Sequence, residues 1–180
     1  VYASPLLMNA GGLHFPVSRS FTSATPRPPF KPITNPALYS RMMMIPSDNI
    51  AAYDFYLRGR QSFYRHTRQY MQHANDMFAR AIEQDAAYAH AYAGRADCHS
   101  YCYYFFGGSQ DDLEQASKDS ETALKLDPGL AEAHAARGLA VSLVRKYEES
   151  EQAFEKAIEL NPNLFEAYYF YASTCFLQGK

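Results

Sequence analysis

The chain has 180 residues, a formal net charge of −2 and an isoelectric point of about 6.3. Residues 51–180 carry 13 basic and 18 acidic residues, and this mild acidity argues against a nucleic-acid surface, which needs clustered Lys and Arg. The sequence contains no run of about 18 apolar residues, so no membrane-spanning helix is expected. The three cysteines are an odd number without metal-ligand spacing, which argues against a disulfide scaffold and favours a reducing, cytoplasmic compartment.

Residues 1–47 show neither helical nor alternating apolar spacing. Eight of the ten prolines lie in residues 1–50, and each removes a backbone donor and disfavours helix in the residue before it. We therefore interpret residues 1–47 as an extended or disordered tail, with one short helix at 38–44. The stretch Arg27–Pro32 could dock as a polyproline II segment, but a linker is the favoured interpretation, because proline-rich composition alone is weak evidence.

The periodic part of the chain begins with two predicted helices. The first runs from Asn49 to about Tyr64, and Ser47 and Asp48 are its candidate caps. The second runs from about Tyr70 to Gln84, and its apolar positions recur at helical spacing. The side chains expected to point inward from the second helix are Ala74, Phe78, Ala81 and Ile82.

The third predicted helix begins near Tyr88 and contains an insertion. The aromatic run Tyr101–Phe106 is expected to lengthen this helix, and the pair Gly107-Gly108 is expected to end it. Ser109 or Asp111 then caps a fourth helix, which is expected to end near Leu126.

Residues 131–164 have the spacing of two amphipathic helices joined by a tight turn. Asn161 and Pro162 are expected to end the second of these and to begin the next, with Asn161 as N-cap and Pro162 in the first turn. A last helix is predicted over 165–177 and is rich in aromatic residues. Because repeat arrays usually finish on a polar cap, we expect the chain to be a fragment, or its end to be covered by a missing repeat or a partner.

The helical pattern returns after 34 residues. Asp127-Pro128 and Asn161-Pro162 lie 34 residues apart, and the stretch 78–85 matches 154–161 at its aromatic, alanine and isoleucine positions. With this period and these motifs, the chain resembles the tetratricopeptide repeat (TPR) family. The resemblance covers roughly residues 48–180 and divides them into units of about 52–88, 89–130 with the insertion, 131–164, and a half unit at 165–180.

The resemblance implies an all-α fold: a right-handed α-solenoid of antiparallel helix hairpins whose first helices line a concave groove. Such a groove suits an extended segment or an amphipathic helix anchored by apolar side chains. Chaperone-tail binding is not expected, because Arg60 is the only basic residue at these positions and a carboxylate clamp uses several Lys, Arg and Asn. Glu166 also falls on the groove face. The predicted peptide-binding residues are Tyr53, Tyr56, Arg60, Tyr64, His90, Asp97, Tyr101, Glu132, Leu139, Tyr169 and Phe170.

Residues 48–60 and 88–98 are similar to bacterial TPR arrays that follow adenylate cyclase domains or winged-helix DNA-binding domains. This similarity implies a signalling or regulatory module, although no cyclase or DNA-binding motif is present. Three arginines stand where most TPR units have Leu: Arg58, Arg95 and Arg137. Their stems lie along apolar surface with the guanidinium in solvent, or they pair with acids such as Asp97 or Glu132. The first interpretation is favoured, because surface ion pairs contribute little.

The sequence favours an interaction protein over an enzyme. Cys98, His99 and Cys102 lack a fourth ligand for a structural zinc site, so a place in the core is favoured. Phosphate-binding, nucleophile-elbow and metalloprotease motifs are missing from the sequence. We expect a non-enzymatic, cofactor-free scaffold for a protein or peptide ligand, without nucleic acid or membrane partners. The alternative is a self-association module that forms homo-oligomers through the half repeat and the aromatic insertion.

Overall fold

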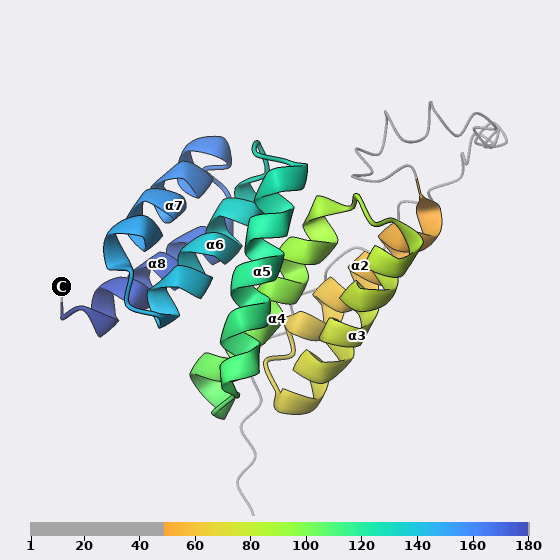
Figure 1. Ribbon diagram of the computed structural model, residues 1–180, viewed down its shortest axis with the longest axis horizontal. Coiled ribbons are helices and arrows are strands. Elements are labelled where there is room, and N and C mark those ends of the chain that lie inside the picture. The colour runs from red at the N-terminus through yellow and green to blue at the C-terminus, as the bar shows by residue number, and fades with distance from the viewer. Residues whose placement is uncertain (1–48, 180) are drawn as a thin grey trace, which may run out of the picture. The chain divides into compact units, whose positions relative to one another are not determined.

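The computed structural model describes residues 49–179, and these residues form seven α-helices and no strands, so the all-α expectation is confirmed (Figure 1). The predicted tail, its short helix at 38–44 and the candidate caps Ser47 and Asp48 lie outside the described residues. The helices are α2 (Ile50–Phe63), α3 (Arg68–Gln84), α4 (Ala89–Phe106), α5 (Gln110–Leu126), α6 (Ala131–Leu143), α7 (Tyr147–Leu160) and α8 (Phe165–Leu177).

The helices pair into hairpins that stack side by side. Helices α2 and α3, α4 and α5, and α6 and α7 each pack as a hairpin. The first helices α2, α4, α6 and α8 pack in succession, and each second helix also packs against the first helix of the next unit (Figure 1). A single hairpin cannot bury both of its apolar faces, and stacking removes this difficulty. None of the helices in residues 49–179 is both long and apolar enough to cross a bilayer.

Two phenylalanine rings set the spacing between helices. The ring of Phe78 on α3 is fully buried, and a Cβ built on either Gly59 of α2 or Gly94 of α4 would lie 2.6 Å from a ring carbon. A Cβ on Gly138 of α6 would lie 2.9 Å from the ring of Phe154 on α7. Larger residues at these glycines would force the rings or the backbones apart, at a typical cost of about 1–3 kcal/mol.

The three links between units share one backbone arrangement. Asp85, Asp127 and Asn161 each follow the last residue of a second helix, and each side chain accepts a hydrogen bond from the amide two residues later, at 2.9–3.1 Å. The prediction that Asn161 is the N-cap of the last helix is wrong. Its side chain is used in this Asx turn, Pro162 lies inside the turn, and Leu164 occupies the N-cap position.

The turns inside the hairpins use a left-handed residue. His66, Gly107 and Arg145 have φ values of 51°, 63° and 62° and occupy the turns that follow α2, α4 and α6. The prediction that the aromatic run lengthens α4 as far as the glycine pair is confirmed. The predicted Ser109 cap is confirmed as well, because Ser109 forms a capping box with Asp112 at the start of α5.

Replacing Arg145 by glycine should stabilise the protein. A non-glycine residue in the left-handed region costs about 1–2 kcal/mol, and glycine removes this cost. Part of the stabilisation is lost again, because glycine raises the conformational entropy of the unfolded chain. We expect Arg145→Gly to raise the free energy of unfolding by about 0.5–1 kcal/mol in chemical denaturation. Gly107→Ala is the matched control and should lower it by about 1 kcal/mol. An Arg145→Gly variant that is less stable than the wild type would contradict this account.

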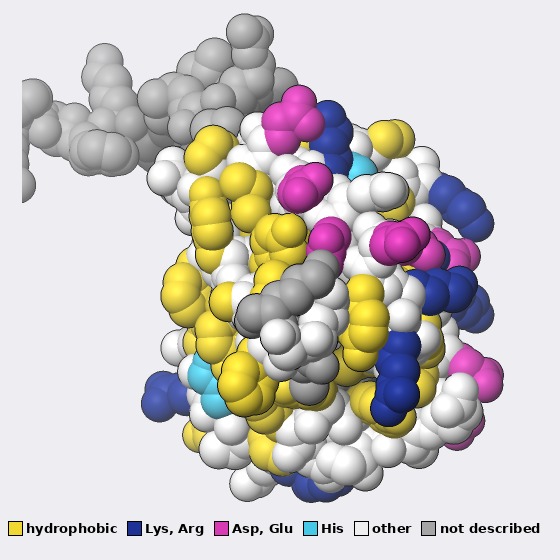
Figure 2. Space-filling view, turned by 90° about the vertical axis from the view of Figure 1, so that its left-hand side faces the viewer, with side chains coloured by type: hydrophobic (Ala, Val, Ile, Leu, Met, Phe, Trp, Pro, Cys, Tyr) yellow, Lys and Arg dark blue, Asp and Glu magenta, His cyan; other side chains and the backbone are white. Residues whose placement is uncertain are grey.

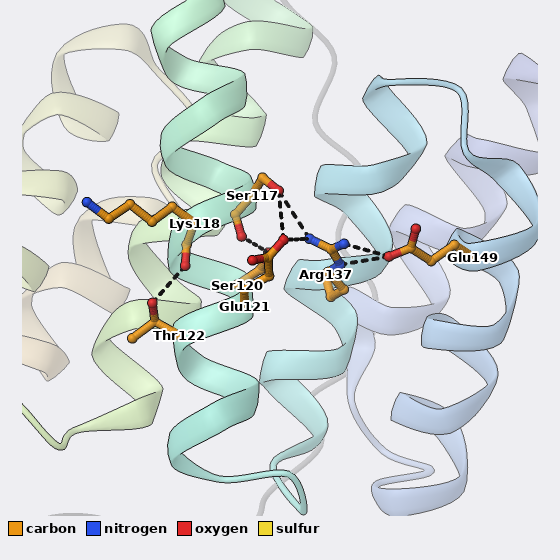
Figure 3. A network of polar contacts seen from close by, with 7 residues as sticks. All are labelled: Ser117, Lys118, Ser120, Glu121, Thr122, Arg137 and Glu149. Atoms are coloured by element: carbon orange, nitrogen blue, oxygen red, sulfur yellow. Dashed lines mark hydrogen bonds and ion pairs between the residues drawn. The ribbon is translucent and has the colours of Figure 1, made fainter.

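The three arginines that replace the usual Leu bind carboxylates. Figure 3 shows Arg137 of α6 between Glu121 of α5, at 2.9 Å, and Glu149 of α7, at 2.6 Å. Arg95 binds the buried Asp119 of α5 through two bonds of 2.7 Å. Arg58 pairs only with Asp54, one turn away on its own helix, and both side chains are exposed.

The favoured interpretation of these arginines is therefore wrong for Arg95 and Arg137, whose guanidinium groups end on carboxylates. The ion-pair alternative named the wrong acids, because neither Asp97 nor Glu132 is a partner. The acids that bind the two guanidinium groups come from α5 and α7, and side chains of second helices could not be aligned with the arginines from repeat spacing alone.

Removing the three guanidinium groups should have graded costs. Arg95→Leu leaves the Asp119 carboxylate, which is 1% exposed, without its partner, and should cost about 3 kcal/mol of unfolding free energy. Arg137→Leu frees carboxylates that water can solvate, and should cost about 1 kcal/mol. Arg58→Leu should change stability by less than about 0.5 kcal/mol. Urea denaturation of the three variants measures this order, and equal costs for Arg95 and Arg58 would contradict it.

Candidate functional site

The first helices of the units place most of the predicted residues on one surface. On α2, four of them recur at intervals of three or four residues, which puts them on one helix face. The remaining residues come from α4, α6 and α8, which pack in succession beside α2. We call the group formed by Arg60, Tyr64, Asp97, Glu132 and Glu166 the polar cluster.

The polar cluster contains an ion pair between α2 and α8. Arg60 and the hydroxyl of Tyr64, both on α2, donate hydrogen bonds to Oε1 of Glu166 on α8. The residues of the ion pair are separated by 106 positions, and α2 and α8 do not otherwise pack against each other. Burial disfavours the charged form of Glu166, but Arg60 and Tyr64 hold the pKa of its carboxyl below the ordinary value.

Asp97 of α4 is the most deeply buried member of the polar cluster. The residue is 5% exposed, and the Oδ1 atom of its carboxyl has no hydrogen-bond partner. Burial raises the pKa of Asp97 to about 8, and the carboxylates of Glu166 and Glu132 add to the shift while Arg60 opposes it. At neutral pH the carboxyl is therefore mainly protonated, although a guanidinium lies near it.

Aromatic rings form a wall next to the polar cluster. Tyr56 contacts the rings of Tyr53, Tyr88 and His90 with centroid distances of 6.5, 5.3 and 5.8 Å, and it also packs on Phe78. Burial raises the pKa of Tyr56 to about 12 and lowers the pKa of His90. Both side chains are therefore neutral at pH 7.

Three predicted groove residues lie in the core. Tyr101, Leu139 and Phe170 are 7%, 5% and 3% exposed, and all three belong to one apolar cluster with Phe78 and Phe154. Tyr169 of α8 is 39% exposed and stacks on Phe165 with a centroid distance of 5.8 Å. The structure thus brings the predicted α2 residues together with His90, Asp97 and Glu132, and leaves Tyr169 on the exposed face of α8.

Cys98 and His99 of α4, two of the candidate zinc ligands, contact other protein groups instead. Cys98 is buried in the core, and the His99 ring bonds Asp112 at 2.9 Å. Within residues 49–179 no three His, Cys, Asp or Glu side chains are arranged to hold a metal ion. Sequence reasoning placed Glu166 on the groove face but missed its bond to Arg60. The one available signal was that these two side chains carry opposite charges on the same predicted face.

Comparison with known proteins agrees with the repeat geometry. Residues 131–164 match the sequence profile of the tetratricopeptide repeat family, and these residues are helices α6 and α7 with their links. Residues 49–179 have the fold of a TPR array. Among curated proteins, none matches the sequence significantly.

Solved TPR domains have the same fold as this array. The first TPR of Spaghetti (RPAP3), bound to the HSP90 peptide SRMEEVD, has 21% sequence identity and a TM-score of 0.56, and the match covers 73% of this chain and 98% of that one. The Arabidopsis OM64 TPR domain has 21% identity and a TM-score of 0.54, covering 71% and 97%. The second TPR domain of human RPAP3, in complex with the HSP70 peptide SGPTIEEVD, has 25% identity and a TM-score of 0.50, covering 78% and 98%.

Asp97 should make the stability of the array depend on pH. Because the pKa of Asp97 is higher in the folded than in the unfolded chain, the native state holds a proton that the unfolded chain releases between about pH 4 and pH 8. The free energy of unfolding should therefore fall as the pH rises through this window. Asp97→Asn cannot ionise, so its stability relative to wild type should grow by more than about 1 kcal/mol from about pH 5 to pH 8.

Urea denaturation at several pH values measures this difference. Asp54→Asn, at an exposed carboxylate on α2, is the control and should track the wild type. Parallel pH profiles for Asp97→Asn and the wild type would contradict the burial of an unpaired carboxyl.

Proposed function

We propose that this TPR array is a non-catalytic interaction module that binds a peptide, or a segment of a partner domain, against α2, α4, α6 and α8. The observation that carries the proposal is the polar cluster, in which the buried Asp97 carboxyl has one oxygen without a hydrogen-bond partner. The Tyr64 ring within the cluster is 49% exposed, and Tyr169, three residues after Glu166 on α8, is 39% exposed. Aromatic anchors beside a desolvated polar group are typical of energetically dominant contacts in interfaces.

The solved relatives support a peptide ligand but not the same peptide. Two of them are bound to chaperone peptides that end in the acidic sequence EEVD. In this chain the series of first helices carries three carboxyl groups in the polar cluster and one guanidinium, which already binds the Glu166 carboxylate. Like charges brought together at an interface disfavour binding, so we expect the ligand to differ from a chaperone tail.

A regulatory role is the second part of the proposal. Its support is the sequence similarity of residues 48–60 and 88–98 to arrays that accompany bacterial cyclase and winged-helix domains. In that setting the array would receive a partner in the cytoplasm and alter the activity of an attached domain.

Selection from a random peptide library on the folded protein tests the proposed binding function. We expect selected peptides whose affinity falls at least about tenfold in Tyr64→Ala or Tyr169→Ala, because each change removes an aromatic anchor. Tyr70→Ala is the matched control, since Tyr70 is 45% exposed but lies on the second helix α3. Selection of no peptide, or an equal loss with Tyr70→Ala, would contradict binding at the first helices.

Self-association is a second candidate function. On α8, Phe165 is 66% and Phe176 81% exposed, and Phe105 of the aromatic insertion is 44% exposed. Figure 2 shows hydrophobic side chains gathered toward one side of this end and charged side chains toward the other. Exposed apolar surface of this kind often marks an interface. Sedimentation over a concentration series should then show a dimer that Phe176→Ser weakens, whereas a strict monomer would remove this candidate.

A further inference from the structure

We propose that the ligand of this surface carries a lysine or arginine side chain, which takes the place that Arg60 now holds on Glu166 and also bonds the neighbouring Asp97. The inference rests on the proposed binding function and names the chemistry of the partner. Its starting point is an imbalance of charge at the polar cluster.

Three helices contribute carboxyl groups to the polar cluster. Asp97 comes from α4, Glu132 from α6 and Glu166 from α8, and the charged group that faces them is Arg60 of α2. The other titratable neighbours of Asp97 are the hydroxyl of Tyr56 and the thiol of Cys98, and both are neutral at pH 7 because burial raises their pKa values. One guanidinium therefore faces three carboxyl groups, and it is bonded to Glu166.

Of the two buried aspartates in residues 49–179, Asp97 lacks a cationic hydrogen-bond donor. Asp119 is 1% exposed, and both of its oxygens accept bonds from the guanidinium of Arg95 at 2.7 Å. Asp97 is buried to a similar extent, but its Oδ1 has no donor. A buried carboxyl oxygen without a hydrogen-bond partner is costly, and a ligand cation that bonds this oxygen would remove the cost. The arrangement around Asp119 is thus the arrangement that a ligand guanidinium would create around Asp97.

Arg60 can give up its position. Its side chain is 18% exposed and is held by Glu166 and by Tyr64, which is itself half exposed. An arginine side chain has enough rotamers to swing into water, where its charge is well solvated. A ligand cation would then bond Glu166 and Asp97 together, and Asp97 would release its proton. Binding should therefore strengthen as the pH rises toward about 8 and level off above it, because below that value the proton competes with the cation.

Calorimetric titration with short synthetic peptides tests the inference. The probe has one central arginine flanked by leucines, and its matched versions carry citrulline, the uncharged isostere of arginine, or glutamate at the centre. We expect the arginine peptide to bind at least about tenfold more tightly than either control. Asp97→Asn should weaken arginine-peptide binding about tenfold and abolish its pH dependence. Arg60→Gln should strengthen binding by removing the competitor, whereas Arg58→Gln, on the same helix but outside the polar cluster, should leave it unchanged.

Thermal denaturation of each variant shows whether it folds, and the order of the wild-type affinities keeps the test decisive if one variant does not. Equal affinity for the arginine and citrulline peptides, or binding of neither, overturns the inference. Library peptides that bind at Tyr64 and Tyr169 without a Lys or Arg would also overturn it and leave the proposed function standing. A dimer of the protein alone that Asp97→Asn disrupts would assign the cation to a second copy and overturn the assignment to a separate partner.

Discussion

The stacking of this protein depends on two phenylalanine rings that press against glycine. Phe78 closes on Gly59 and Gly94, and Phe154 closes on Gly138, at distances that leave no room for a side chain. Each ring is a fixed spacer, because interiors packed at this density do not deform cheaply. The rings hold a second helix against one or two first helices, and the first helices consequently lie side by side. The surface proposed to bind a partner is a product of this packing.

The charged side chains are paired differently on the two sides of the stack. On the side of the second helices, Arg95 and Arg137 bind carboxylates of α5 and α7, and each guanidinium has acidic partners that come from neighbouring helices. On the side of the first helices, the carboxylate that Arg60 bonds is that of Glu166, and Asp97 keeps an oxygen without a hydrogen-bond partner. Natural proteins rarely bury a polar atom in this way without a reason. The contrast between Asp119, both of whose oxygens accept bonds from Arg95, and Asp97, one of whose oxygens has no partner, is the physical basis of the functional proposal.

Much of the fold could be predicted from the sequence because local rules determine it. Apolar spacing located the helices, the repeated prolines gave the period, and the glycine pair after the aromatic run marked the end of α4. The errors arose where one side chain had two possible uses. Asn161 can cap a following helix or form an Asx turn, and the local sequence does not decide between them.

The candidate site could be predicted only as a set of positions. Repeat spacing placed Arg60, Asp97 and Glu166 on first helices, but the bond between Arg60 and Glu166 joins residues 106 positions apart and depends on how far side chains reach across two intervening helices. The burial of Tyr101, Leu139 and Phe170 depends on the same tertiary packing. Neither the pairing nor the burial leaves a signal in a single sequence, because both arise from the summed geometry of several units.

The most direct measurement is an NMR titration of the carboxyl carbon of Asp97, in the free protein and with the arginine peptide bound. We expect a midpoint near pH 8 in the free protein, because burial and the neighbouring carboxyl groups of Glu166 and Glu132 raise the pKa of Asp97, and a fall of more than about one pH unit when the peptide cation binds. A free-protein midpoint near the ordinary value of about 4, or a midpoint that the bound peptide leaves unchanged, would contradict it.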